Sequence, residues 1–198
     1  MPKNRLLQLS ELISITLVRY VFFWIMRSKK VSRVALDTNK AYIIAANHSG
    51  AIDPFIITAN LPWHYILTLT PYRFMTANKF FSRTLLLPFL FALGCYPANK
   101  HPRFKSGLEY TQKLIEKRYC IVIFPEGKVS RIDRQYPARK GIEVLVQDSG
   151  VEILPVRVKW NRRKGLLRSY SLTVGKPFSG KNMTAEQIMD VVYGLKFR

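Results

Sequence analysis

Apolar and polar positions alternate along the chain in short blocks that predict strands and helices in turn. Four apolar blocks rich in Ile, Val and Leu predict strands, at residues 41–46, 121–124, 153–158 and 171–175. Stretches with a helical period or a helix-start signal lie around them, at 54–60, 82–93, 104–117, 139–148 and 184–195. Strands separated by helices predict an α/β fold with a mainly parallel sheet.

The most apolar stretch covers residues 6–26 and carries two charged residues, Glu11 and Arg19. No charge-free window reaches the ~20 residues that span a bilayer, and basic residues flank both ends. We therefore predict a helix that lies in the membrane interface, with its flanking cations on phospholipid headgroups. A buried core helix is one alternative. A signal peptide is another, although the following residues, MRSKK, lack a small-residue cleavage site.

These patterns divide the chain into a membrane-contacting helix, residues 1–34, and one globular domain, residues 35–198. The net charge of +20 attracts polyanions, of which nucleic acid, an anionic membrane leaflet and phosphorylated substrates are three kinds. The basic run from Arg157 to Arg168 has Trp160 among its cations, but no nucleic-acid-binding motif accompanies it. We interpret it as a solvated face near anionic lipid or an acidic carrier protein, and we expect no nucleic-acid partner.

The cysteines and two of the histidines give no sign of a metal or redox site. Cys95 and Cys120 follow no ligand spacing and are interpreted as small packed residues. His64 and His101 have no acidic or cysteine neighbour at ligand spacing, so we interpret them as surface or satisfied side chains.

Candidate chemistry lies directly after the first predicted strand, in the segment Asn47-His48-Ser49-Gly50-Ala51-Ile52-Asp53. If the turn folds back, the Asp53 carboxylate can bond Nδ1–H of His48 and leave Nε2 free to take a proton. This is the base and its orienting carboxylate from a catalytic triad, with the hydroxyl supplied by a substrate. The alternative is that Asp53 caps the helix beginning at Pro54 and His48 is a polar loop residue.

A second motif, Phe124-Pro125-Glu126-Gly127-Lys128-Val129-Ser130-Arg131, follows the second predicted strand. Ligands bind at the carboxyl ends of strands in parallel α/β sheets. Gly127 permits close backbone approach, while Lys128 and Arg131 offer cations to a phosphate. A charged surface turn is the alternative.

The two motifs together resemble the signatures of the glycerolipid acyltransferase family, which includes the 1-acyl-glycerol-3-phosphate acyltransferases. Its first signature is a histidine, four residues and an aspartate, matched by His48 and Asp53. Its third signature, Phe-Pro-Glu-Gly, is matched at residues 124–127, and Ile153-Leu154-Pro155-Val156 is similar to the fourth. The resemblance covers about residues 41–195.

This resemblance implies the acyltransferase fold: a central mixed, mostly parallel sheet flanked by helices, with an N-terminal membrane-contacting helix. It implies that His48 takes the proton of an acceptor hydroxyl as that hydroxyl attacks a thioester, with Asp53 orienting His48. Substrate contacts are expected from six residues: Asn47, Lys100, Glu126, Gly127, Lys128 and Arg131. The implied acceptor is a lysophospholipid, above all 1-acylglycerol-3-phosphate, and the donor is acyl-CoA or acyl carrier protein. No metal or bound cofactor is implied, because the energy lies in the thioester.

Two departures from the family pattern concern the acceptor. Where the second signature has an arginine six residues after a glycine, Gly94 is followed by Lys100, which keeps the charge but loses the bidentate fork. Lys128-Val129 replaces the usual threonine-arginine pair of the third signature. Acylation of another lysolipid headgroup, and non-catalytic lipid binding, therefore remain as alternatives. We expect the protein on anionic lipids at the cytoplasmic face of the inner (plasma) membrane.

Overall fold

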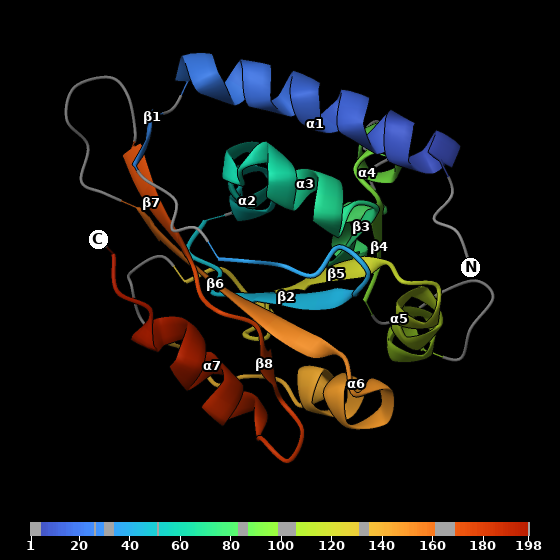
Figure 1. Ribbon diagram of the computed structural model, residues 1–198, viewed down its shortest axis with the longest axis vertical. Helices are drawn as coiled ribbons and strands as arrows, with labels where there is room; N and C mark the ends of the chain where they lie inside the picture. The colour runs from blue at the N-terminus through green and yellow to red at the C-terminus, as the bar shows by residue number, and fades with distance from the viewer. Residues whose placement is uncertain are drawn as a thin grey trace.

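The computed structural model of the chain describes residues 5–25, 27–29, 34–50, 52–82, 87–98, 106–130, 135–160 and 169–197. These residues form three layers, with a sheet between two layers of helices (Figure 1). The predicted mixed, mostly parallel sheet flanked by helices is confirmed.

The central layer is an eight-stranded sheet of order β1-β7-β6-β2-β5-β3-β4, with β8 beside β6. β7 and β8 run antiparallel to β6, and the other pairs are parallel. The strands are β1 (Arg27–Lys29), β2 (Tyr42–Ala46), β3 (Tyr72–Thr76), β4 (Cys95–Pro97), β5 (Cys120–Ile123), β6 (Glu152–Trp160), β7 (Ser169–Val174) and β8 (Phe178–Ser179). The four predicted strands correspond to β2, β5, β6 and β7.

Strand β2 lies near the middle of the sheet and is buried along its whole length. Its side chains alternate between two cores: Ile44 packs in the cluster on one face, while Ile43 and Ala45 pack in the cluster on the other. A strand covered on both faces must be apolar at consecutive positions, which explains the continuous run seen in the sequence.

Helices α1, α2, α3 and α4 cover one face of the sheet, and α5, α6 and α7 cover the other (Figure 1). They are α1 (Arg5–Ile25), α2 (Asp53–Asn60), α3 (Trp63–Leu69), α4 (Leu87–Ala92), α5 (Gly107–Glu116), α6 (Gly141–Ser149) and α7 (Ala185–Gly194), with a short 3₁₀ turn at Asn78–Phe80. Thr184 caps α7 through a capping box, near the start of the stretch predicted at 184–195. Of the expected helix at 82–93, α4 forms the second half, and residues 83–86 lie outside the described part.

Helix α1 lies along the outside of α2 and α4 (Figure 1) and turns Gln8, Glu11 and Arg19 toward the rest of the protein. Gln8 donates to the Thr70 carbonyl, Arg19 donates to the Leu61 carbonyl, and the Glu11 carboxylate accepts the Tyr72 amide at 2.9 Å and the Arg73 guanidinium. These bonds tie the helix to the loops and to β3.

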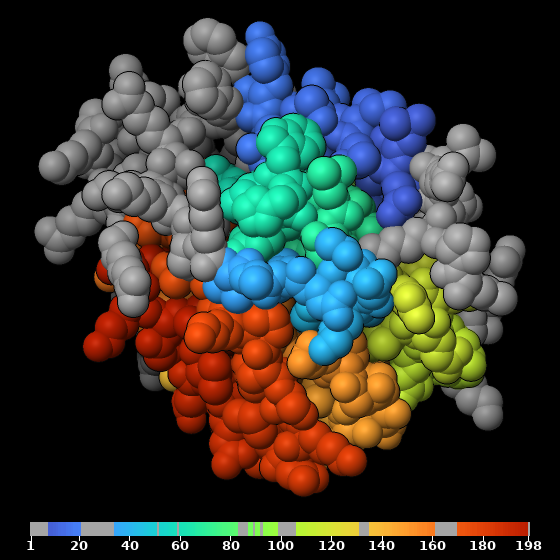
Figure 2. All heavy atoms as spheres, in the orientation of Figure 1, coloured from blue at the N-terminus to red at the C-terminus, as the bar shows by residue number. Residues whose placement is uncertain are grey.

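The opposite side of α1 is apolar and open to solvent. Leu9, Ile13, Leu17 and Tyr20, spaced at about one helical turn, are 56–65% exposed, whereas Ile15 is buried in the core. Figure 2 shows the helix along the rim of the molecule. In the described part of the chain, no helix combines the length and the hydropathy that crossing a membrane requires.

Candidate active site

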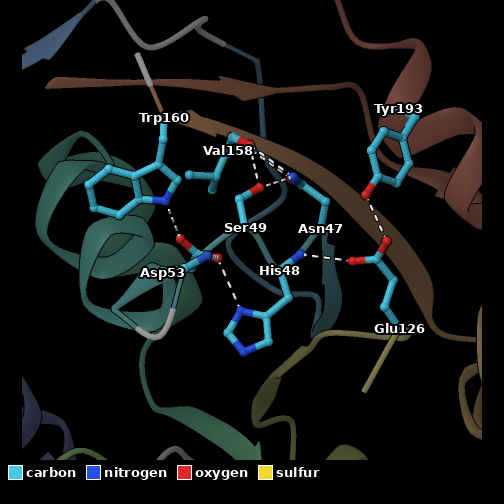
Figure 3. A network of polar contacts seen from close by, with 9 residues as sticks. Asn47, His48, Ser49, Asp53, Glu126, Val158, Trp160 and Tyr193 are labelled. Atoms are coloured by element: carbon cyan, nitrogen blue, oxygen red, sulfur yellow. Dashed lines mark hydrogen bonds and ion pairs between the residues drawn. The ribbon is translucent and has the colours of Figure 1, made fainter. Parts of the chain in front are cut away.

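The turn that carries His48 begins directly after β2, where the side chain of Asn47 makes the hydrogen bonds to β6 that a backbone would otherwise make. The Asn47 amide oxygen accepts the Val158 N–H at 2.7 Å, and its nitrogen donates to the Val158 carbonyl at 2.8 Å (Figure 3). The pairing of β2 with β6 is thereby continued by a side chain. The backbone of Asn47 therefore does not pair with β6, and the chain turns from the end of β2 toward α2.

His48 and Asp53 meet as the sequence predicts. His48 Nδ1 lies 3.0 Å from Asp53 Oδ2, and the same oxygen accepts the Gly50 N–H at 2.7 Å (Figure 3). The Asp53 side chain is fully buried, whereas that of His48 is 17% exposed. Asp53 is the first residue of α2 and makes no capping bond to a helix amide, so the capping alternative does not describe it.

The second ring nitrogen of His48, Nε2, has no hydrogen-bond partner within the described part of the chain. The imidazole stacks on Phe124, with ring centroids 4.3 Å apart. In the tautomer that donates Nδ1–H to this carboxylate, Nε2 carries no proton and faces away from Asp53. This geometry suits a general base.

The buried Glu126 side chain connects the turn after β5, on which it lies, with the turn that carries His48. Its Oε2 accepts the backbone N–H of His48 at 3.1 Å, and its Oε1 accepts the Tyr193 hydroxyl at 2.7 Å (Figure 3). Its Oε1 also accepts the Tyr136 N–H at 3.0 Å. The residue is 2% exposed, and both carboxylate oxygens are engaged by protein donors. The carboxylate therefore anchors the backbone of His48.

Two cations, Lys128 and Arg139, lie at the surface beside the turn that follows Glu126. Gly127 adopts a positive φ of 64°, and a Cβ built there would lie 2.4 Å from Arg139 Nε, so the guanidinium packs directly over this glycine. The Lys128 ammonium sits 3.8 Å from the centroid of the Tyr136 ring. Neither cation has an acidic partner in the described residues.

A cavity of about 750 Å³ adjoins these residues and is lined by His48, Lys128 and Arg139 among others. Most of its wall is apolar and comes from both faces of the sheet: Phe55, Leu90 and Leu93 on one side, and Leu108, Ile142 and Leu145 on the other. The size and lining are those of a site for an apolar ligand with a few polar groups at one end.

Cys95 also lines the cavity, where burial raises the pKa of its thiol above the ordinary value. A thiol nucleophile reacts as the thiolate, which burial in apolar surroundings disfavours. This agrees with the interpretation of Cys95 as a packed residue. Within the described residues, no group of three His, Cys, Asp or Glu side chains is placed to hold a metal ion.

The structure thus brings together His48, Asp53, Asn47, Glu126, Gly127 and Lys128. Lys100 and Arg131, the two further expected phosphate ligands, lie outside the described residues. Sequence reasoning did not assign site roles to Arg139, Trp160 or Tyr193. Their only signal in the sequence is a cation, an aromatic ring and a phenol at ordinary-looking positions: Arg139 is 12 residues from Gly127, Trp160 is 107 residues from Asp53, and Tyr193 is 67 residues from Glu126.

Comparison with known proteins relates the chain to acyltransferases. A family model described as "Acyltransferase" matches residues 27–159. A curated 1-acyl-sn-glycerol-3-phosphate acyltransferase from Limnanthes douglasii is 26% identical over an alignment of 167 residues, and the match covers 78% of this chain and 56% of that protein. The chain thus spans little more than half the length of this relative.

The fold is also similar to a solved structure. The crystal structure of the 1-acyl-sn-glycerophosphate (LPA) acyltransferase PlsC from Thermotoga maritima superposes with a TM-score of 0.68 at 16% sequence identity. The match covers 92% of this chain and 76% of that one. At this identity the likeness establishes the fold.

Proposed function

The chain belongs to the acyltransferase family, and we propose that it transfers a fatty acyl group from a thioester to the hydroxyl of 1-acylglycerol-3-phosphate, as an O-acyltransferase of phospholipid synthesis. The observation that carries this proposal is the His48–Asp53 pair at a large apolar cavity, where Nε2 of His48 has no hydrogen-bond partner among the described residues. The relatives are named as acyltransferases of 1-acyl-sn-glycerol-3-phosphate and of 1-acyl-sn-glycerophosphate (LPA), which supports this acceptor.

In the proposed reaction, His48 Nε2 takes the proton of the acceptor hydroxyl as its oxygen attacks the thioester carbonyl. Asp53 holds the Nδ1 proton and stabilises the imidazolium that forms. The tetrahedral intermediate then expels the thiolate, which receives the proton from His48. The products are the ester and the free thiol, so protons and electrons balance without a metal or a bound cofactor.

The negative oxygen of the intermediate needs a hydrogen-bond donor. The backbone N–H of His48 is already bonded to Glu126, that of Gly50 to Asp53, and that of Gly127 to the Phe124 carbonyl. The N–H of Lys128 has no acceptor in the part of the chain that the structure describes. We assign the oxyanion contact to this amide.

The acceptor phosphate is assigned to the Lys128 and Arg139 cations at the cavity, together with Lys100 and Arg131. Two cations without an acidic neighbour are available to a dianion, and a guanidinium binds phosphate oxygens in pairs. Gly127 supports this site because its missing side chain makes room for Arg139. Asn47 and Glu126 are assigned to positioning, since their polar atoms are bonded to protein.

The acyl chain of the donor, acyl-CoA or acyl carrier protein, occupies the apolar cavity in this proposal. The exposed apolar side of α1 rests on anionic membrane lipids at the cytoplasmic face of the membrane, where the acceptor resides. An exposed row of large apolar side chains on a strongly basic protein supports this placement.

The test is a panel assay with purified protein in mixed micelles. Palmitoyl-CoA and palmitoyl-acyl carrier protein serve as donors, and 1-acylglycerol-3-phosphate, other lysophospholipids and glycerol 3-phosphate serve as acceptors. We expect thiol release and diacyl product to be fastest with 1-acylglycerol-3-phosphate. A higher kcat/KM with another lysolipid would identify that lysolipid as the acceptor instead. Folded protein with no thiol release from any pair would leave the non-catalytic lipid-binding alternative.

A further inference from the structure

The Asp53 carboxylate is held by three donors that are divided unequally between its two oxygens. Oδ2 accepts from His48 Nδ1 and from the Gly50 N–H, whereas Oδ1 accepts from the indole N–H of Trp160 at 3.1 Å (Figure 3). The carboxylate is fully buried, so a lost donor is not simply replaced by bulk water. Trp160 therefore fixes the rotation of the carboxylate plane that His48 faces.

Trp160 owes its position to the sheet. It is the last residue of β6, it pairs with Tyr170 of β7, and the two rings meet edge to face with centroids 6.0 Å apart. Because side chains alternate along a strand, Trp160 lies on the same side of the sheet as Val158, toward α2. Strand β6 is also the strand to which Asn47 is bonded. One strand thus aligns both ends of the His48–Asp53 turn.

Gly50 leaves the space that the indole occupies. A Cβ built on Gly50 would lie 2.7 Å from Trp160 Nε1 and 3.0 Å from Cε2. The φ angle of Gly50 is not positive, so close approach of the indole, and not backbone conformation, accounts for a glycine here. The bond to Asp53 and the close approach to Gly50 both place the indole against the turn.

We propose that Trp160 is a positioning residue for the catalytic pair: its N–H orients the Asp53 carboxylate, which in turn fixes the Nδ1 proton of His48, and Gly50 makes room for it. The inference rests on the proposed function for its kinetic consequence. Trp160 lies one position beyond the segment that the family model matches, which ends at residue 159, so the family match does not assign it.

The kinetic test uses Trp160→Phe, which keeps an aromatic ring and removes the donor. A hydrogen bond to a charged group corresponds to about a 10- to 100-fold change in rate, so we expect kcat to fall by that factor. The KM values of donor and acceptor should stay within about twofold. Trp63→Phe, at an exposed tryptophan on α3, is the matched control and should keep the wild-type kcat. A folded Trp160→Phe protein with kcat within twofold of wild type overturns the proposal.

Gly50→Ala tests the same contact from the other side. Its methyl group should displace the indole and lower kcat as Trp160→Phe does. In the Trp160→Phe background, Gly50→Ala should cost less than about threefold, because the bond is already lost. Full additivity of the two losses would overturn the assignment of Gly50 to this contact.

A second measurement needs no turnover. The chain has three histidines, so the ring nitrogens of His48 are assigned by ¹⁵N NMR against His48→Ala. We expect a single Nδ1–H tautomer in the wild-type neutral ring and a mixture of tautomers in Trp160→Phe. An unchanged tautomer overturns the positioning role. A changed tautomer in a protein that transfers no acyl group supports the positioning role and counts against the proposed function alone.

Discussion

Lys128 and Arg139 are two cations from different parts of the chain that meet at one turn. Lys128 is the residue after Gly127, and Arg139 reaches Gly127 through the space that a side chain would fill. The Arg139 N–H is bonded to the Pro125 carbonyl at 2.9 Å, which holds its backbone beside the turn. Neither side chain forms an ion pair among the residues that the structure describes, so a phosphate can bind without displacing an acidic partner there.

We expect Lys128→Ala and Arg139→Ala each to raise the KM for a phosphorylated acceptor by about tenfold or more, because each removes a hydrogen bond between charged groups. The KM for the thioester should stay within about twofold. Lys181→Ala, on an exposed loop, is the control. Initial-rate kinetics with each substrate varied in turn measures the effect. Equal increases in both KM values would assign these cations to the donor instead.

Glu126 was expected from the sequence to contact the substrate, and its surroundings indicate another role. We expect Glu126→Gln to lower kcat and to lower the melting temperature by about 2–10 °C, because a buried donor loses its acceptor at about 1–3 kcal/mol. Tyr193→Phe should have a smaller effect, since the two backbone donors to Glu126 remain. Calorimetry measures the melting temperatures, and initial-rate kinetics measures kcat and the acceptor KM of both variants. A rise in acceptor KM at unchanged stability would restore the substrate contact.

The residue scale also shows what the sequence could and could not predict. The His48–Asp53 pair was predictable because both residues lie in one short turn at a strand end. The bonds from Trp160 and Tyr193 were not, because they depend on which strand and helix lie beside the turn. Trp160 is 107 residues from Asp53, and Tyr193 is 67 residues from Glu126.

At the element scale, α1 is buried on one side only, and its contact with a membrane stays a prediction. One side packs against the core through Ile15 and Val18, while the other side is apolar and exposed. The charged residues that interrupt the apolar stretch point inward, and burial raises the pKa of Glu11 despite its bonds to Arg73 and Tyr72. Hydrophobic periodicity alone could not predict this orientation, because a buried ion pair reverses the usual relation between polarity and exposure.

We expect Glu11→Ala to destabilise the protein by about 3–5 kcal/mol, because it leaves the Arg73 guanidinium without its buried partner. Ile13→Ala, on the exposed side of the same helix, should change stability by less than about 0.5 kcal/mol. Urea unfolding of both variants measures the difference. Similar stability of the two proteins would mean that Glu11 does not anchor α1.

Substitutions on the exposed side of α1 should weaken membrane attachment and leave stability unchanged. Replacing Leu9, Ile13 and Leu17 by serine should move the protein from the membrane pellet to the soluble fraction, since each fully buried side chain contributes about 1.5–3 kcal/mol. Melting temperature and turnover of a short-chain acceptor in solution should change little. About 1 M salt should leave the wild-type protein in the pellet, because salt weakens only the contribution of the cations. Complete release by salt would assign the attachment to charge alone.

The sequence predicted the central strands of the sheet but not β3 and β4, and the difference has a physical reason. The central strands β2, β5 and β6 were visible because burial on both faces requires consecutive apolar residues. Strand β3, whose residues Arg73 and Thr76 interrupt the apolar pattern, and β4, with three residues, were not predicted. Both line the cavity through Phe74 and Cys95, so the sequence indicated the catalytic edge of the site but not its apolar wall.

At the scale of the whole molecule, the site exists because β2 and β5 are neighbouring parallel strands. Their carboxyl ends meet at one edge of the sheet, so His48 and Glu126 come into contact although 78 residues separate them. The Ser130 N–H bonds the His48 carbonyl at 2.6 Å and closes the same junction from the other side. The fold thus places the proposed base His48, the Asp53 carboxylate and the cations Lys128 and Arg139 around one cavity.

The central claim, that His48 is the general base of acyl transfer, is tested most directly by the turnover of His48→Ala. Diacyl product from palmitoyl-CoA and 1-acylglycerol-3-phosphate is measured at saturating substrates, with melting curves to confirm folding. His64→Ala, at an exposed histidine of α3, is the control. We predict that His48→Ala loses about 10²–10⁴ in kcat while His64→Ala keeps the wild-type rate. A folded His48→Ala protein with more than about a tenth of the wild-type kcat would contradict the claim.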